Sequence, residues 1–220
     1  IEGDIIQGNA ARYVVESKLV QRMSRGYSLT CGDSKFFLKS YPPYRWKHFN
    51  GERKAFEAHL PASGNSSIVY PVEILPRISG LIFPYIEGVS IGEVVSKKKL
   101  LSPENVWTVL QTVGGALQYI HNLGLVHLDV KPDNLLLEIP LGELKDDSIE
   151  NYPLGGINTK LIDFGTLRET DFQIDPNFRL GNPATVSPEV LKALKVDHRA
   201  DIYSLSATLY ELLTGEIAFA

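Results

Sequence analysis

The segment His127-Leu-Asp-Val-Lys-Pro-Asp-Asn134 is the most informative part of the sequence for the fold. It comes directly after a strongly helical segment and holds a carboxylate (Asp129), a lysine (Lys131) and an amide side chain (Asn134) within six positions. Taken singly, these residues have an ordinary structural explanation, since Asp and Asn are common in turns and loops. Their meaning depends on the segments that come later in the chain.

Two further short segments follow in order. Asp163-Phe-Gly165 comes directly after the apolar Lys160-Leu-Ile162, and Ser187-Pro-Glu189 lies further on. Each segment alone is more often a turn than a functional site. Three such segments in a fixed order indicate a function far more specifically than any one of them, because all three rarely occur together in this order by chance.

In this order the segments resemble the signature of eukaryotic-type protein kinases: a catalytic loop, a metal-binding Asp-Phe-Gly and a Pro-Glu that ends the activation segment. The Lys131-Pro132 pair is similar to that of the serine/threonine branch. The resemblance implies an α+β bilobal fold, with a small antiparallel β N-lobe and a mainly helical C-lobe. One kinase-like domain would then span 1–220, with the N-lobe at about 10–87 and a partial C-lobe at 88–220 that lacks its last helices.

The resemblance also implies the chemistry, which is ATP-dependent phosphoryl transfer to Ser/Thr hydroxyls of protein or peptide substrates. Such transfer requires mainly positioning and charge neutralisation. Asp129 would act as the base and Lys131 would stabilise the transferring phosphoryl group. Asn134 and Asp163 would supply the hard oxygen ligands that Mg²⁺ prefers.

Four further residues are implied as cofactor-binding. Lys39 ends an apolar strand, where the family has its phosphate-anchoring lysine. Its helix partner is Glu52 or Glu57, and we favour Glu52 because the helix is ending near Glu57, four residues before Pro61.

The other two implied residues belong to the end of the apolar stretch 80–86, which resembles the hinge that binds adenine. Pro84 would offer its carbonyl group, and Ile86 would offer its N–H and C=O groups. Further along, Asp201 matches the family's helix aspartate that supports the catalytic loop.

The sequence departs from the family pattern at three places. Gly26 is the only glycine between Leu19 and Leu29, where the family has three; Phe37 replaces a small alanine; and Leu128 replaces an arginine. The first two changes favour the alternative of a catalytically weak or inactive pseudokinase that serves as a scaffold. A small-molecule phosphotransferase fits less well, because the Lys-Pro pair and the Ser-Pro-Glu segment point to a peptide substrate.

Composition excludes several other classes of protein. Of 220 residues, 44% are hydrophobic and 22% charged, which is ordinary globular usage. The net charge of −4 lacks the basic excess of a nucleic-acid-binding protein, so we expect no nucleic-acid partner. A single cysteine, Cys31, excludes an internal disulfide and favours the cytoplasm. We find no apolar run long enough to span a membrane.

The same patterns predict the elements. A hairpin is expected at 27–31 and 35–39, a helix at 51–60, strands at 68–75 and 80–86, a helix that begins after Ser102 and ends at Gly124, and a helix at 201–213. The acidic stretch 139–158 has two interpretations, a solvated insertion or a docking site for a basic regulatory partner. Loss of the last helices would expose Leu205, Leu209 and Leu212.

Overall fold

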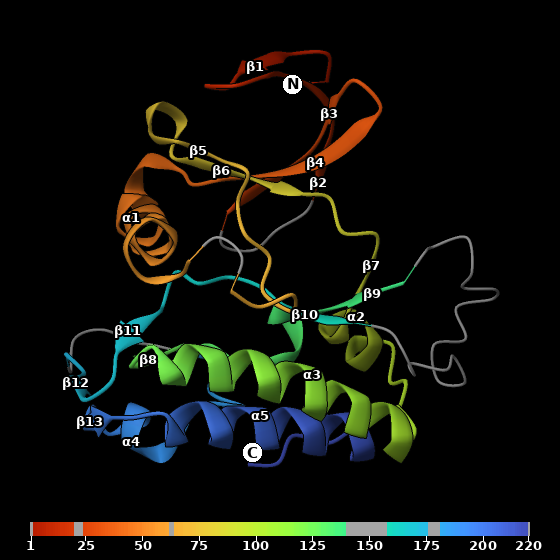
Figure 1. Cartoon of the computed structure of the whole chain (residues 1–220). Coiled ribbons are helices and arrows are strands. Elements are labelled where there is room, and N and C mark those ends of the chain that lie inside the picture. Colours follow the sequence, from red (N-terminus) through yellow and green to blue (C-terminus); the bar gives the residue numbers. More distant parts are fainter. Residues whose placement is uncertain (1, 20–23, 62–63, 140–157, 176–180, 220) are drawn as a thin grey trace. The chain divides into compact units, whose positions relative to one another are not determined.

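The computed structural model describes the whole chain except residues 1, 20–23, 62–63, 140–157, 176–180 and 220 (Figure 1). The chain divides into two compact units. Unit 1 comprises residues 1–63 and 69–86, and unit 2 comprises residues 64–68 and 87–220. Residues 140–157 of the acidic stretch 139–158 lie outside the described residues, and so do residues 20–23 of the segment between Leu19 and Leu29 in which the family has three glycines.

Unit 1 is built on one antiparallel six-stranded sheet with the order β1-β2-β3-β4-β6-β5. Its strands are β1 (Ile5–Gln7), β2 (Arg12–Leu19), β3 (Arg25–Cys31), β4 (Ser34–Ser40), β5 (Glu73–Leu75) and β6 (Gly80–Pro84). The sheet is curled, so that β5 at one end of the strand order comes close to the other end. Glu73 on β5 accepts hydrogen bonds from Tyr13 Oη on β2 (3.0 Å) and from Asn9 N just before β2 (2.7 Å). Alternating side chains of β2, β3 and β4 fill the core of the sheet.

The predicted hairpin is confirmed, since Cys31 pairs with Ser34 across the two-residue turn that begins at Gly32, whose φ is 57°. The left-handed backbone there suits glycine, which has no Cβ to clash. The predicted strand 68–75 is mostly wrong, because only Glu73–Leu75 joins the sheet. Pro71 lies within the predicted run and has no N–H to donate to a strand ladder.

The helix of unit 1 begins earlier than predicted. A 3-10 turn at Pro43–Arg45 leads directly into α1 (Trp46–Lys54), which continues as a π-helical turn at Ala55–His59. Proline suits the first position of a helical turn because its φ is already fixed there. The helix therefore starts after the proline pair, whereas the prediction placed its first residue at Gly51.

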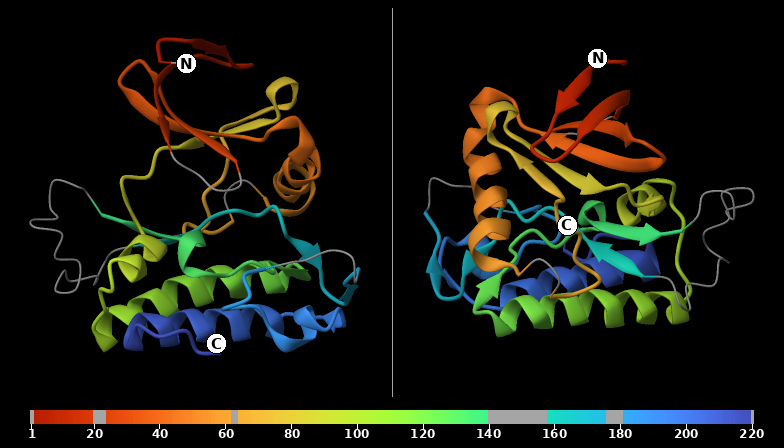
Figure 2. Two further views of the ribbon diagram at one scale, coloured as in Figure 1. Left: turned by 180° about the vertical axis from the view of Figure 1, so that it is seen from behind. Right: turned by 45° about the horizontal axis from the view of Figure 1, so that its top comes forward.

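Unit 2 contains the long helices α3 (Pro103–Asn122) and α5 (Arg199–Thr214), which pack side by side (Figures 1 and 2). Both confirm the sequence-based predictions. The Ser102 hydroxyl accepts a hydrogen bond from Asn105 N (3.2 Å) at the start of α3. Gly215 ends α5 in the left-handed conformation, with φ 74°.

Short elements complete unit 2. The helices α2 (Ile91–Ser96) and α4 (Pro188–Leu191) accompany three small antiparallel sheets. Their strands are β7 (Gly88–Ser90), β8 (Leu125–Val126), β9 (Leu135–Glu138), β10 (Thr159–Leu161), β11 (Arg168–Glu169), β12 (Phe172–Gln173) and β13 (Lys195–Val196), ordered β10-β9-β7, β11-β8 and β12-β13.

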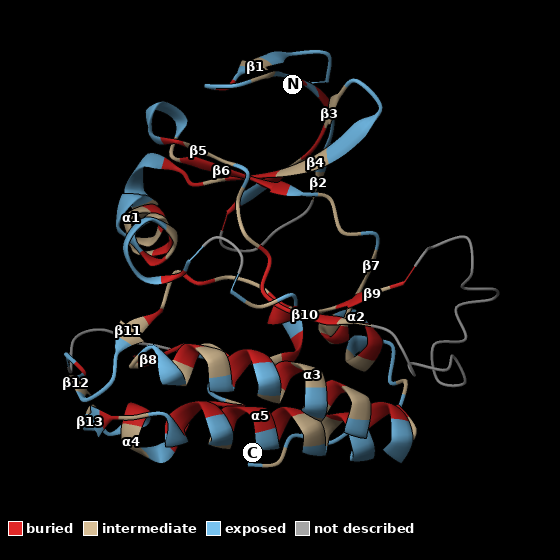
Figure 3. Ribbon diagram, viewed as in Figure 1, coloured by how far each residue is buried: buried red, intermediate tan, exposed pale blue. Residues whose placement is uncertain are grey.

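Burial along α5 differs from the expectation. Leu205 and Leu212 are buried and Leu209 is half-buried, since α5 packs against α3 and other parts of unit 2. The exposed apolar side chains of this helix are instead Ile202, Tyr210 and Leu213. Figure 3 shows that α5 has both buried and exposed stretches. In the part of the chain that the structure describes, no helix combines the length and the apolar character needed to cross a bilayer.

Candidate functional site

The loop between β8 and β9 brings three of the predicted site residues into direct contact. Lys131 Nζ lies 2.6 Å from Asp129 Oδ2, and Asn134 Nδ2 donates to the same oxygen at 2.9 Å. Asn134 Nδ2 also donates to the Asp129 backbone oxygen at 2.8 Å. Two donors therefore converge on Oδ2, and Oδ1 remains as the second acceptor of the carboxylate.

Strand pairing carries Asp163 to the same end of a sheet as Asn134. In the β9–β10 ladder Leu135 pairs with Leu161, and Ile162 N donates to the Asn134 backbone oxygen at 3.0 Å. Asn134 immediately precedes β9 and Asp163 follows β10 by two residues. The antiparallel register thus places two oxygen-bearing side chains, 29 positions apart in the sequence, beside the same loop.

The Asp163-Phe-Gly165 segment is fixed to the loop by contacts inside unit 2. The Phe164 ring packs edge-on against His127, with 5.0 Å between centroids, and Thr166 Oγ1 donates to the His127 backbone oxygen at 2.8 Å. Burial lowers the pKa of His127, which favours the neutral ring, and the ring Nδ1 accepts a hydrogen bond from Asp129 N (3.3 Å). Asp163 itself adopts a left-handed backbone, with φ 67°, which Asp tolerates better than most residues.

Asp201 holds the start of the loop from α5. Its carboxylate is fully buried and accepts hydrogen bonds from His127 N and Leu128 N, both at 2.8 Å. His121 Nε2 on α3 lies 2.9 Å from Asp201 Oδ2. One carboxylate therefore ties together α3, α5 and a loop residue, Leu128, whose φ is 65°.

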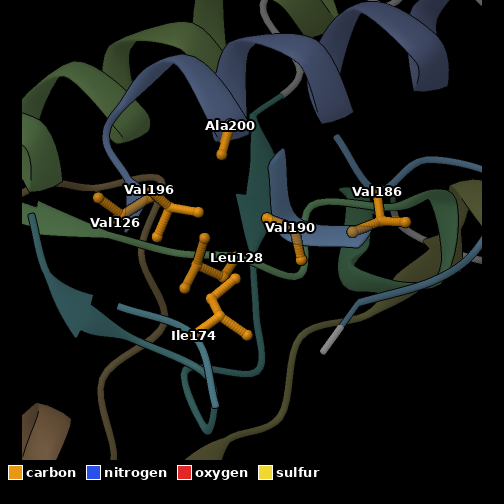
Figure 4. Close-up of a cluster of buried hydrophobic side chains, with 7 residues drawn as sticks. All are labelled: Val126, Leu128, Ile174, Val186, Val190, Val196 and Ala200. Carbon is orange, nitrogen blue, oxygen red and sulfur yellow. The ribbon is translucent and has the colours of Figure 1, made fainter. Parts of the chain in front are cut away.

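Leu128 occupies the position where the family has an arginine, and its side chain is buried in an apolar cluster (Figure 4). The cluster consists of Val126, Leu128, Ile174, Val186, Val190, Val196 and Ala200. It joins the loop to the segment between β12 and α4. The contact at this position is thus hydrophobic rather than ionic.

Unit 1 contains the second group of predicted residues. Lys39 Nζ on β4 lies 3.0 Å from Glu52 Oε1 on α1, and both residues are buried. Glu57, the other candidate, lies 3.5 Å from Arg53 Nε on the helix surface. Tyr41 Oη donates to Glu52 Oε2 at 2.7 Å.

The two residues of the predicted hinge lie at the end of unit 1. Pro84 is the last residue of β6, opposite Phe36 on β4, and is exposed; Ile86 lies two residues further on and is half-buried. Phe37 pairs with Phe83 across the β4–β6 ladder. Phe37, which stands where the family has an alanine, therefore lies directly opposite a second phenylalanine.

The predicted residues thus form one group in each unit: Lys39 with Glu52 in unit 1, and Asp129, Lys131 and Asn134 with Asp163 at the adjoining strand end in unit 2. Sequence reasoning missed the contacts of Tyr41, Thr166 and His121. Tyr41 could have been found, because residues two apart on a strand share a face and Tyr41 follows Lys39 by two.

Comparisons with known proteins identify the family. The family model described as "Protein kinase domain" matches residues 71–220. The chain is 29% identical over 155 residues to the human serine/threonine-protein kinase ULK1, covering 70% of this chain and 14% of that protein. It is 35% identical over 141 residues to the serine/threonine-protein kinase PknL of Mycobacterium tuberculosis, covering 63% of this chain and 31% of that protein.

The structure is similar to the crystal structure of the BubR1 kinase domain, with a TM-score of 0.72 over 99% of this chain and 66% of that chain. Sequence identity there is 17%, so this likeness concerns the fold, and it confirms the predicted α+β bilobal kinase fold. The chain spans less than a third of the length of either curated relative. Because the family model covers most of the sequence, including the whole 127–189 region, the chain belongs to the protein kinase domain family.

Proposed function

We propose that this chain transfers the γ-phosphoryl group of ATP to Ser/Thr hydroxyls of protein substrates. The observation that carries the proposal is the contact of Asp129, Lys131 and Asn134 in one loop, with Asp163 at the adjoining strand end. Because Lys131 and Asn134 both bind Asp129 Oδ2, the carboxylate is held in one orientation and Oδ1 is the oxygen that would accept the substrate hydroxyl proton.

The donor set fits a magnesium nucleotide. Asn134 uses its amide nitrogen for Asp129, which turns its amide oxygen away from that carboxylate, and Asp163 adds a carboxylate. Within the described ranges no three His, Cys, Asp or Glu residues form a metal-binding group. Mg²⁺ is usually bound by one or two carboxylates together with substrate phosphates, and Asp163 with the Asn134 amide oxygen would supply such ligands. When bound, Mg²⁺-ATP supplies the phosphoryl group and neutralises its charge.

The residues of unit 1 would anchor the nucleotide. Lys39, paired with Glu52, would bind phosphate oxygens, and the backbone groups of Pro84 and Ile86 would bind adenine. Lys131 would stabilise the transferring phosphoryl group while it keeps Asp129 oriented.

The test is transfer of labelled phosphate from Mg²⁺-ATP to peptides that differ only in carrying Ser, Thr or Tyr. Asp129→Asn and Asp163→Asn should each lower the rate about 10²- to 10⁴-fold. Asp133→Asn is the matched control, since Asp133 lies in the same loop and is exposed. Wild-type rates in Asp129→Asn, or transfer to Tyr alone, would contradict the proposal.

A non-catalytic scaffold is the second candidate, favoured by Phe37 beside Phe83 and by Gly26 as the single glycine between Leu19 and Leu29. Nucleotide binding separates the two. A competent site should gain about 2.7 kcal/mol of stability when Mg²⁺-ATP is present at about 100 times its Kd. The absence of a thermal shift at millimolar nucleotide would favour the scaffold.

A further inference from the structure

A tyrosine immediately after β4 lies on the same face as the proposed phosphate-binding lysine. Side chains alternate along a strand, so Lys39 and Tyr41 point the same way. The Tyr41 backbone is fixed at this point, because its N–H donates to the Ser79 carbonyl oxygen at 2.9 Å. Tyr41 is 5% exposed, Lys39 7% and Glu52 1%, so the three side chains share a buried environment.

Lys39 and Tyr41 each contact a different oxygen of Glu52. Lys39 Nζ lies 3.0 Å from Oε1, and Tyr41 Oη donates to Oε2 at 2.7 Å. Lys39 Nζ also lies 5.3 Å from the centroid of the Tyr41 ring, within the range of a cation–π interaction. Tyr41 thus contacts both members of the ion pair, through its hydroxyl and through its ring.

The ring also contacts the helix that carries Glu52. Tyr41 and Phe49 have ring centroids 6.3 Å apart, and Phe49 precedes Glu52 by three residues on the same side of α1. The backbone of Tyr41 is held by the Ser79 carbonyl oxygen just before β6, and its side chain contacts α1 at two places. It therefore fixes the position of the Glu52 carboxylate relative to β4.

We propose that Tyr41 is a positioning residue that holds Glu52 against Lys39 and so sets where the lysine meets the nucleotide phosphates. The inference rests on the proposed function, because it takes Lys39 as a phosphate ligand. Loss of a hydrogen bond to a buried carboxylate is unfavourable, so the carboxylate shifts toward any other donor within reach. Without the Tyr41 hydroxyl, Glu52 would have one donor fewer to fix its orientation, and Lys39 would be held less firmly.

Tyr41→Phe tests this, because it removes the hydroxyl and keeps the ring and its packing. Affinities for Mg²⁺-ATP and for adenosine are measured by calorimetry on the full chain. ATP affinity should fall about 3- to 30-fold, a part of what a hydrogen bond to a charged group contributes. Adenosine affinity should stay unchanged, because adenosine has no phosphate for Lys39 to bind.

Tyr13→Phe is the matched control. Tyr13 is equally buried in the same sheet, and its hydroxyl also donates to a carboxylate, Glu73, at 3.0 Å. This control should leave both affinities unchanged. In a Glu52→Gln background Tyr41→Phe should have much less effect on ATP affinity, since a residue that acts through Glu52 is coupled to it.

Three outcomes would overturn the inference while the proposed function stands: Tyr41→Phe binds ATP as the wild type does, it loses adenosine affinity equally, or it has its full effect in the Glu52→Gln background. If the wild type binds no nucleotide, the proposed catalytic function fails and the inference fails with it. A loss of phosphate-dependent affinity that is specific to Tyr41→Phe and absent in Tyr13→Phe supports it.

Discussion

Asp201→Asn should destabilise unit 2 far more than its small change in size suggests. The Asp201 carboxylate is fully buried and makes three hydrogen bonds, to His127 N, Leu128 N and His121 Nε2. An asparagine keeps the shape but replaces one acceptor oxygen by a donor NH₂ group. In its better orientation the amide oxygen serves His127 N and His121, and the NH₂ group faces the Leu128 N–H.

The magnitude follows from these contacts. Each of the two retained hydrogen bonds changes from a charged to a neutral acceptor, which weakens it by about 1 kcal/mol. The Leu128 N–H is left buried without an acceptor, which costs at least about 1 kcal/mol more. We therefore expect the free energy of unfolding to fall by about 3 kcal/mol.

Urea unfolding followed by circular dichroism measures this change, with Asp171→Asn as the control. Asp171 and Lys195 form an ion pair of 3.2 Å whose side chains are mostly exposed, so this substitution should cost less than about 1 kcal/mol. Asparagine also suits the left-handed backbone of Asp171, whose φ is 66°. Equal shifts in the two variants would refute the argument that burial and hydrogen bonding make Asp201 different.

Four further substitutions have clear expected outcomes. A Cβ added at Gly114 in α3 would meet no atom within 4 Å, so Gly114→Ala should raise the free energy of unfolding by up to about 1 kcal/mol. Gly88→Ala should lower the free energy of unfolding, because the new Cβ would collide with the Leu137 backbone oxygen. Urea unfolding of both variants checks this, and changes of the same sign would contradict it. Leu128→Ala should cost about 2–5 kcal/mol by the same assay, since it leaves a cavity in the apolar cluster, and a loss below about 1 kcal/mol would show that the cluster collapses around it. Burial, together with the hydrogen bond to its carboxylate partner, raises the pKa of Tyr13 from 10.0 to about 12, so folding favours the neutral phenol. That contribution is fully present below pH 10 and is lost as pH rises toward about 12, so Tyr13→Phe should show a shallower alkaline loss of stability than the wild type in unfolding midpoints measured across this window. Parallel curves would contradict the assignment.

Local signals predicted the elements whose ends are set by neighbouring residues. Ser102 and the apolar stripe behind it define α3, and Gly215 ends α5, because caps act within one helical turn. The start of α1 at Trp46 was missed, since no capping side chain marks it; the helix grows out of the preceding 3-10 turn. Burial of Leu205 and Leu212 was also missed, because it depends on how α5 packs within unit 2.

The family and the chemistry of the loop can be predicted from the amino-acid sequence alone. Asp129, Lys131 and Asn134 lie within six residues, so their contact needs only a local turn. The remaining contacts depend on the folded chain. Asp163 approaches Asn134 only through the β9–β10 register, Asp201 joins the loop from α5, and Glu52 rather than Glu57 contacts Lys39 because of where α1 lies against β4. Such contacts join residues that are far apart in the sequence, so they depend on strand register and helix packing. Local sequence patterns do not specify either of these.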